Sequence, residues 1–128
     1  MKYDIIGDIH GAANKLVQLL EKLGYQQTNG IYQQEGHQAI FVGDFIDRGT
    51  SQKGVINIVR PMIDSKKALA VMGNHEFNAI CYHTANTEKP GEYLRSHKEK
   101  NTEQHQAFLN EYPLASIETN ELIEWFKT

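Results

Sequence analysis

The 128-residue chain has little cysteine, little proline and no long apolar run: one Cys and three Pro stand among its residues. Cys81 has no partner for an internal disulfide bond. Because it follows an apolar stretch of a predicted helix, we interpret it as a small buried residue and not as a nucleophile. No run of about eighteen apolar residues and no signal-like N-terminus are present. We therefore expect a cytoplasmic protein with no membrane partner.

The chain also has no excess of basic charge. Thirteen Lys and Arg residues against sixteen Asp and Glu residues give a formal net charge of −3 at pH 7. This balance argues against general nucleic-acid binding through charge alone. Binding of an anionic ligand would have to depend on a local site instead of a basic face.

Three short apolar runs are present, and each ends in glycine followed by a polar residue: residues 4–8, 40–44 and 70–74, ending in Asp8, Asp44 and Asn74. Each run predicts a buried strand, and the polar residue then lies at the carboxyl end, where open α/β sheets collect ligands. The spacings of 36 residues (44 − 8) and 30 residues (74 − 44) suit strand-helix-strand units. We therefore expect an α/β fold with a convergent, oxygen-rich metal site.

The first junction adds an imidazole to its carboxylate. His10 follows Asp8 by two positions, so in extended backbone both side chains would leave the same side of the chain and bind one ion. Ile9 would then face the core. A carboxylate with an imidazole suits Mn, Fe or Zn better than Ca or Mg, which prefer all-oxygen ligand shells.

The second and third junctions add groups for phosphate and protons. Asp44 is placed to bridge two ions, and a tight turn closed by glycine follows with Asp47 and Arg48. The Arg48 guanidinium has the planar geometry that phosphate oxygens require. Asn74 adds a neutral oxygen ligand, and His75 beside it is suited to proton transfer.

Each motif alone has an ordinary structural explanation. An isolated Asp-x-His is usually a solvated turn or a helix cap, and a lone Asp-Arg-Gly is usually a surface ion pair of little energetic value. Asn-His-Glu alone is a common helix start with Asn as N-cap. The occurrence of all three in order, each behind a strand and a glycine, favours the metal site.

The segments Gly7-Asp8-Ile9-His10-Gly11, Gly43-Asp44-Phe45-Ile46-Asp47-Arg48-Gly49 and Gly73-Asn74-His75-Glu76 resemble the first three signature motifs of the calcineurin-like metallophosphoesterases. The resemblance covers residues 3–82 and is strongest to the branch with the Ser/Thr protein phosphatases and the bacterial bis(5′-nucleosyl)-tetraphosphatases. It implies the N-terminal part of an α/β/β/α sandwich. It also implies a phosphohydrolase that uses two divalent metal ions, Mn or otherwise Fe, Zn or Mg, to activate a hydroxide.

The resemblance assigns roles to seven residues. It implies that Asp8 and His10 bind the first metal, that Asp44 bridges the two metals and that Asn74 binds the second. It further implies that Arg48 holds the phosphate and that His75, oriented by Asp47, protonates the leaving oxygen. The substrate would be a phosphorylated small molecule or a nucleotide, with phosphoproteins as a further class.

Two histidines that complete the family's second metal site are missing from this chain. We interpret the remaining histidines as surface residues: His37, His83, His97 and His105. Only the elements of the family's first sheet are present, so we expect residues 1–128 to form a single N-terminal domain fragment of a longer protein. An uncovered apolar sheet would favour self-association. A non-catalytic, metal-binding fragment or pseudo-enzyme therefore stays open as the alternative to a hydrolase.

The remaining pattern places the elements. Strands are expected at 3–6, 39–42 and 68–72, a hairpin at 25–34, and helices at 12–23, 53–63 with an interruption near Pro61, 74–82 and 121–128. Residues 83–106 show no apolar period, which predicts a solvated loop before a helix around Phe108 and Leu109. The alternative is a substrate-facing lid that carries Arg95 and His97.

Overall fold

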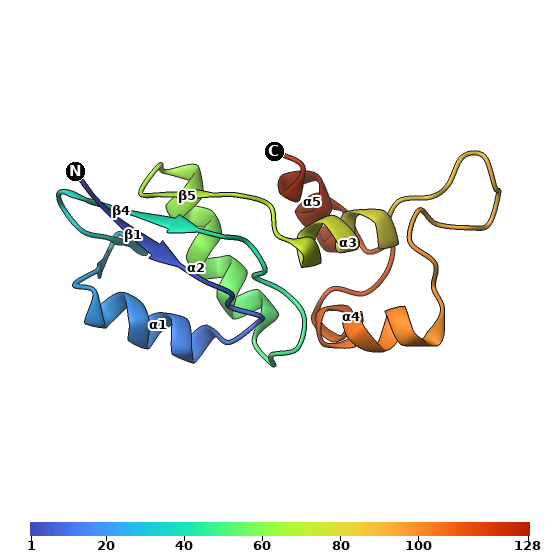
Figure 1. Ribbon diagram of the computed structural model, residues 1–128, viewed down its shortest axis with the longest axis horizontal. Helices are drawn as coiled ribbons and strands as arrows, with labels where there is room; N and C mark the ends of the chain where they lie inside the picture. Colours follow the sequence, from blue (N-terminus) through green and yellow to red (C-terminus); the bar gives the residue numbers. More distant parts are fainter.

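The computed structural model describes residues 1–128 and has the α/β architecture expected from the sequence (Figure 1). The elements follow in the order β1 (Lys2–Ile6), α1 (Ala13–Lys22), β2 (Gln26–Thr28), β3 (Ile31–Gln33), β4 (His37–Phe41), α2 (Gln52–Asp64), β5 (Ala68–Ala70), α3 (Asn74–Tyr82), α4 (Glu99–Glu111) and α5 (Ile117–Phe126). The sheet with α1 and α2 forms one end of the molecule, and α3 to α5 form the other. None of these helices is both long enough and apolar enough to span a bilayer.

The central sheet has three parallel strands in the order β1-β4-β5. Its register places Ile5, Ile40 and Leu69 in one row across the sheet. Strands β2 and β3 form a separate antiparallel hairpin. The hairpin turns at Asn29 and Gly30, whose φ angles of 53° and 80° are both positive, as the tight turn predicted by Asn-Gly requires.

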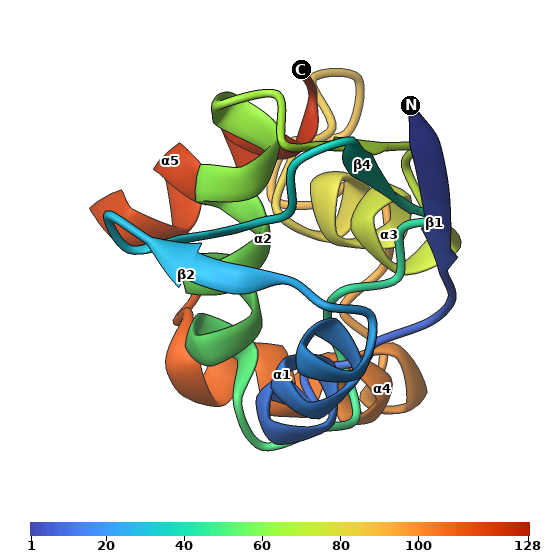
Figure 2. The same ribbon diagram turned by 90° about the vertical axis from the view of Figure 1, so that its left-hand side faces the viewer.

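Helices α1 and α2 cover only one face of this sheet, as right-handed crossovers in one direction require. Ile6, Ala39, Phe41 and Ala68 point to that face and are at most 2% exposed. They share one hydrophobic core with the helix residues Leu16, Leu20, Val55, Val59 and Met62. Figure 2 shows β1 at the margin of the molecule, with α2 on the inner side of the sheet.

The opposite sheet face carries apolar side chains in contact with solvent. Ile5 is 73% exposed, Leu69 is 49% exposed and Val71 is 59% exposed. With Tyr3 and the half-buried Ile40 they form what we call the apolar sheet face. Parallel sheets are normally covered on both faces, so this face lacks the layer that such a sheet usually has.

Helix α4 joins the two ends of the molecule. The carboxylate of Glu111 accepts the backbone amides of Gln52 at 2.6 Å and Lys53 at 3.1 Å. These amides are the unpaired first donors of α2, so Glu111 caps that helix and offsets its positive end. Phe108 from α4 and Tyr112 directly after it extend the core toward α5.

Several boundaries differ from the sequence predictions. Helix α2 continues through Pro61 to Asp64, because proline there removes only one hydrogen bond near the helix end. Strand β5 ends at Ala70 and not at residue 72. Helix α5 begins at Ile117, because Ser116 caps it by accepting the amide of Thr119 at 3.1 Å. Cys81 lies on α3, as expected, and is half-buried.

The predicted loop over residues 83–106 is wrong in its second part, because α4 already begins at Glu99. The inward side chains of α4 are His105 and Phe108. A histidine at an inward position hides the apolar periodicity by which an amphipathic helix is found.

Candidate metal centre and neighbouring histidine pair

The loops after β4 and β5 pack against each other at a distance that only glycine permits. A Cβ atom on Gly43 would lie 2.2 Å from the amide nitrogen of Gly73. A Cβ atom on Gly73 would lie 2.4 Å from Asp44 Oδ1. Gly43 and Gly73 are therefore what allows the ends of β4 and β5 to lie this close together.

Asp8, His10 and Asp44 form a group of three potential metal ligands. One donor atom from each lies within 4.8 Å of the other two. The His10 Nδ1 atom lies 3.0 Å from the carbonyl oxygen of Ile46. A carbonyl only accepts, so Nδ1 carries the hydrogen and the lone pair of Nε2 is free for an ion. This donor set, two carboxylates and one correctly oriented imidazole, fits a divalent transition metal.

The backbone brings this cluster together in a way that the sequence did not predict. His10 has φ 47° and is left-handed, not extended. Its side chain still lies beside Asp8, with 3.6 Å between His10 Nε2 and Asp8 Oδ2. The carbonyl of Asp44 fixes the loop by accepting the amides of Ile9 at 3.1 Å and His10 at 2.9 Å. As expected, Ile9 is buried.

Backbone strain is concentrated at these loops. Four of the seven non-glycine residues with positive φ are candidate site residues: His10 at 47°, Asp44 at 55°, Asp47 at 71° and Arg48 at 70°. A left-handed non-glycine residue costs roughly 1–3 kcal/mol and persists only where its surroundings hold it, which is common at functional sites. The strain supports a functional interpretation of the three loops.

Glu76 is an anchor of the site that sequence reasoning missed. The residue is 2% exposed, and its carboxylate accepts three backbone amides, from Asp44 at 2.5 Å, Phe45 at 3.0 Å and Gly73 at 3.1 Å. Burial raises the pKa of Glu76, and the three amides act in the opposite direction. The available signal was its place three residues after the helix cap Gly73, as in a capping box.

His75 lies between the metal cluster and Asp47. Its backbone amide donates to Asp44 Oδ1 at 2.9 Å, and its Nδ1 lies 2.6 Å from Asp47 Oδ2. The His75 and His10 rings have centroids 4.6 Å apart. The structure thus places the imidazole expected to transfer a proton beside the carboxylate expected to orient it.

The interpretation of His105 as a surface residue is wrong. It is 5% exposed, and its Nδ1 lies 2.7 Å from Asp47 Oδ1. His83 is only half-buried, but its Nε2 lies 3.0 Å from His105 Nε2. His105 follows Asp47 by 58 residues and stands behind no strand-glycine junction, so the only available signal was its position three residues before Phe108 on one helix face.

The other two histidines are also held by specific contacts. His37 Nδ1 lies 3.0 Å from Asp4 Oδ2, and this carboxylate also accepts the Tyr25 hydroxyl at 2.8 Å. His97 stacks on Tyr82, with ring centroids 3.9 Å apart, and its Nε2 lies 2.8 Å from the Tyr82 carbonyl oxygen. His97 therefore does not have the free imidazole that a phosphate-facing lid residue would need.

Arg48 and Asn74 are exposed at the mouth of the site. Together with His75 they line an open pocket whose far wall is formed by α4 residues, including Gln104. Arg95 lines a small neighbouring pocket and donates to Gln104 Oε1 at 3.2 Å. Of the two lid candidates, Arg95 is the one that lines a pocket together with His75 and His105.

The chain matches a known protein family and is similar to curated relatives. A family model described as calcineurin-like phosphoesterase matches residues 1–126. The chain is 49% identical over 76 residues to the asymmetrical bis(5′-nucleosyl)-tetraphosphatase PrpE of Oceanobacillus iheyensis, and 41% identical over 76 residues to that of Bacillus subtilis. The aligned part is 59% of this chain in both cases, and 30% and 31% of the respective relatives.

Two solved structures are similar over part of the chain. One is a putative diadenosine tetraphosphatase, with TM-score 0.48 and 26% identity over 62% of this chain and 31% of that one. The other is a protein serine/threonine phosphatase from Saccharomyces cerevisiae, with TM-score 0.46 and 21% identity over 84% of this chain and 30% of that one.

Proposed function

The chain belongs to the calcineurin-like phosphoesterase family, and from this premise we propose that it is the N-terminal part of a metal-dependent hydrolase of phosphate esters or dinucleoside polyphosphates. The chain spans about 30% of the length of the curated relatives that it matches. The observation that carries the proposal is the Asp8, His10 and Asp44 cluster directly beside the His75–Asp47 pair. A donor cluster for metal and an oriented imidazole are the two components that metal-assisted hydrolysis needs.

In the proposed site Asp8, His10 and Asp44 would hold the first divalent ion, Mn or otherwise Fe or Zn. Asn74, with Asp44, would contribute to holding a second. When bound, such ions lower the pKa of coordinated water and neutralise charge on phosphate oxygens. Asp44 suits a position shared by the two ions because it lies between the two groups of ligands. Its carboxylate is close to Asp8 and His10, and its Oδ1 accepts the amide of His75, the residue next to Asn74.

Arg48 and His75 act on the substrate in this proposal. The exposed Arg48 guanidinium lines the same pocket as His75 and would bind equatorial phosphate oxygens. Asp47 occupies Nδ1 of His75, which leaves Nε2 as the ring atom for the leaving oxygen. A carboxylate on Nδ1 also stabilises the cationic ring that donates the proton.

The substrate class is proposed from the relatives. The curated relatives are named asymmetrical bis(5′-nucleosyl)-tetraphosphatases, which favours a nucleotide substrate over a phosphoprotein. The pocket walls agree with a polar leaving group, because seven residues line it and only one is apolar. We place the protein in the cytoplasm, where such nucleotides are found.

A non-catalytic, metal-binding role is the second candidate. It is favoured by the composition of the site: Asp8, His10 and Asp44 are the one group of three or more His, Cys, Asp or Glu side chains with converging donor atoms. A second ion would depend on Asp44 and the neutral Asn74 alone. This chain by itself would then bind one ion and hydrolyse nothing.

Metal stoichiometry and turnover together test the proposal. The protein is titrated with Mn²⁺ in a calorimeter and assayed with diadenosine tetraphosphate and p-nitrophenyl phosphate. We expect Mn-dependent hydrolysis that Asp44→Asn abolishes and that the exposed-carboxylate control Glu88→Gln retains. Binding of a single ion without hydrolysis of either substrate would support the non-catalytic role instead.

A further inference from the structure

His105 is a buried titratable side chain that the proposed mechanism does not use. It comes from α4, far along the chain from the metal-binding loops, and its side chain is 6% exposed. A buried imidazole has to find hydrogen-bond partners for both ring nitrogens or lose stability. The hydrogen-bond partners of the two ring nitrogens therefore indicate the role of His105.

The first partner is the carboxylate that orients His75. Asp47 Oδ2 lies 2.6 Å from His75 Nδ1, and Asp47 Oδ1 lies 2.7 Å from His105 Nδ1. A carboxylate offers only acceptors, so both rings carry their hydrogen on Nδ1 and donate it to Asp47. One carboxylate therefore joins two imidazoles, one from α3 and one from α4.

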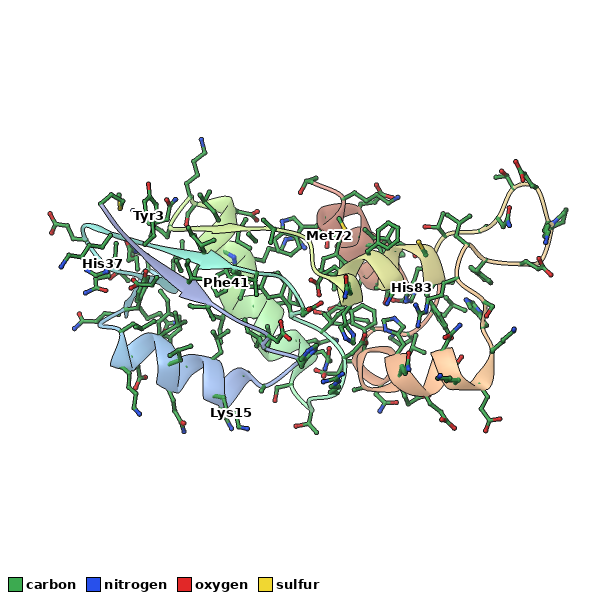
Figure 3. The ribbon with its side chains drawn as sticks, viewed as in Figure 1. Tyr3, Lys15, His37, Phe41, Met72 and His83 are labelled. Carbon is green, nitrogen blue, oxygen red and sulfur yellow. The ribbon has the colours of Figure 1, made fainter.

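The second partner is His83, which contacts the other ring nitrogen of His105. His83 Nε2 lies 3.0 Å from His105 Nε2, so one hydrogen lies between the two rings. The other nitrogen of His83, Nδ1, is buried without any partner. Figure 3 shows His83 between α3 and α4. The His105 ring also stacks on Phe108, with centroids 4.5 Å apart and an interplanar angle of 19°, so it cannot turn freely.

Asp47 needs such a support because its own backbone does not favour the observed conformation. Its φ is 71°, and its amide is held by Gln52 Oε1 at 2.9 Å. Gln52 fixes the backbone of Asp47 but not the torsion of its carboxylate. His105 is the group that contacts the oxygen opposite His75, and this contact sets that torsion.

From this geometry we propose that His105 is a positioning residue: it locks the Asp47 carboxylate so that Asp47 holds His75, and His83 locks the ring of His105 in turn. The inference rests on the proposed function of His75 as proton donor. A purely structural role would consist of mutual satisfaction of two buried polar groups, without any effect on His75. The two roles differ in what happens at the His75 ring when His105 is replaced.

Asparagine and leucine are a matched pair of replacements for His105. The side-chain amide of His105→Asn can take the place of Nδ1 and donate to Asp47 Oδ1, whereas His105→Leu fills similar space without a donor. Proton NMR of the metal-free chain, with ¹⁵N-labelled histidine, observes the Nδ1–H signals of His75 and His105 downfield of the amides. His75→Asn identifies the signal of His75.

We expect His105→Leu to remove or broaden the His75 Nδ1–H signal and His105→Asn to retain it. An unchanged His75 signal in His105→Leu would overturn the proposal. Equal loss of the signal in both variants would also overturn it, because general damage to packing would then be sufficient. Should the leucine variant not fold, His105→Gln replaces it: its amide mimics Nε2 and reaches His83 but not Asp47, so it is expected to lose the His75 signal as leucine does.

Turnover provides the second readout. In the active, metal-loaded protein His105→Leu is expected to lower kcat by about 10- to 100-fold, the usual effect of removing a partner behind a site residue. KM should change little, and His105→Asn should recover most of the loss. The NMR result does not depend on activity. Loss of the His75 signal in a chain that hydrolyses nothing would refute the proposed function and leave the positioning role of His105 standing.

Discussion

His75 and Asp44 are in direct contact, with the His75 amide 2.9 Å from Asp44 Oδ1, yet their proposed roles predict different failures. His75→Asn should leave metal content intact and lower turnover of the active protein by roughly 10² to 10⁴, the range for a positioned proton donor. The loss should be smaller for p-nitrophenyl phosphate, because its phenolate leaves without a proton. Asp44→Asn should lose metal and activity together for both substrates. Equal losses for good and poor leaving groups in His75→Asn would rule out proton donation.

His83 gives the folded protein a characteristic response to acid. Burial, with His105 and His97 nearby, lowers the pKa of His83 from 6.5 to about 4, while Asp47 acts weakly in the opposite direction. The unfolded chain protonates His83 below its ordinary pKa of 6.5, whereas the folded chain resists until about pH 4. The contribution of His83 to the free energy of unfolding is therefore fully present above pH 6.5, and it is lost as pH falls from 6.5 to 4.

The prediction is checked by urea unfolding of the wild type and His83→Gln at several pH values across this window. Glutamine removes the titrating ring. We therefore expect the wild type to lose more free energy of unfolding than His83→Gln as pH falls from 6.5 to 4. The carboxylates titrate equally in both proteins and cancel in the comparison. Parallel stability curves would show that His83 is not the group responsible.

Single residues show which contacts of the candidate site could be predicted from the sequence and which could not. The three strand-glycine junctions marked Asp8, Asp44 and Asn74 because each motif is local, and local patterns are visible in one sequence. His105 was missed because its contact with Asp47 is made only when α4 folds back onto the loop after β4. Glu76 was missed for a similar reason, since two of its three amide partners lie on that loop.

At the scale of elements, the glycines that precede the candidate ligands differ in whether the packing requires a glycine. Gly7 and Gly73 both follow a strand and precede a candidate ligand. A Cβ atom on Gly73 would lie 2.4 Å from the amide nitrogen of Asp44, whereas a Cβ atom on Gly7 would meet nothing within 4 Å. The φ of Gly73 is −87°, so alanine is sterically wrong there without being conformationally strained.

We therefore expect Gly73→Ala to displace Asp44, to destabilise the fold by about 1–3 kcal/mol as overpacking usually does, and to weaken metal binding. Gly7→Ala is the matched control and should change neither property appreciably. Thermal unfolding and calorimetric metal titration of the two variants measure both effects. Comparable damage from Gly7→Ala would show that close packing of the loops is not the reason for these glycines.

Helices and strands were predicted correctly where the sequence pattern is typical of only one kind of element. The hairpin at Asn29-Gly30 and helix α3 over Asn74–Tyr82 have the positions that the sequence indicated. The start of α4 was missed because an inward histidine interrupts its apolar face. The end of α2 was misjudged because Pro61 lies where a helix can lose one hydrogen bond without stopping.

At the scale of the whole molecule, the apolar sheet face is the feature with the clearest physical consequence. Ile5 at 73%, Leu69 at 49% and Val71 at 59% exposure lie on a parallel sheet that α1 and α2 cover from one side only. Burial of apolar surface stabilises association by about 25 cal/mol per Å², and contiguous apolar patches of a few hundred Å² mark interaction sites. A second copy of this chain offers an equally apolar surface, so we predict that the chain self-associates through this face.

Light scattering coupled to size-exclusion chromatography tests this prediction over a range of concentrations. The double variant Ile5→Lys with Leu69→Lys places two charges in one row of the sheet, next to Ile40, and should shift the chain to monomer without loss of fold, since neither side chain belongs to the core. Leu19→Lys is the matched control, because Leu19 is 39% exposed on α1, away from the sheet face. If the wild type stays monomeric at high concentration, or if Leu19→Lys dissociates it as effectively as the sheet variant, the apolar sheet face is not the surface through which copies of this chain associate.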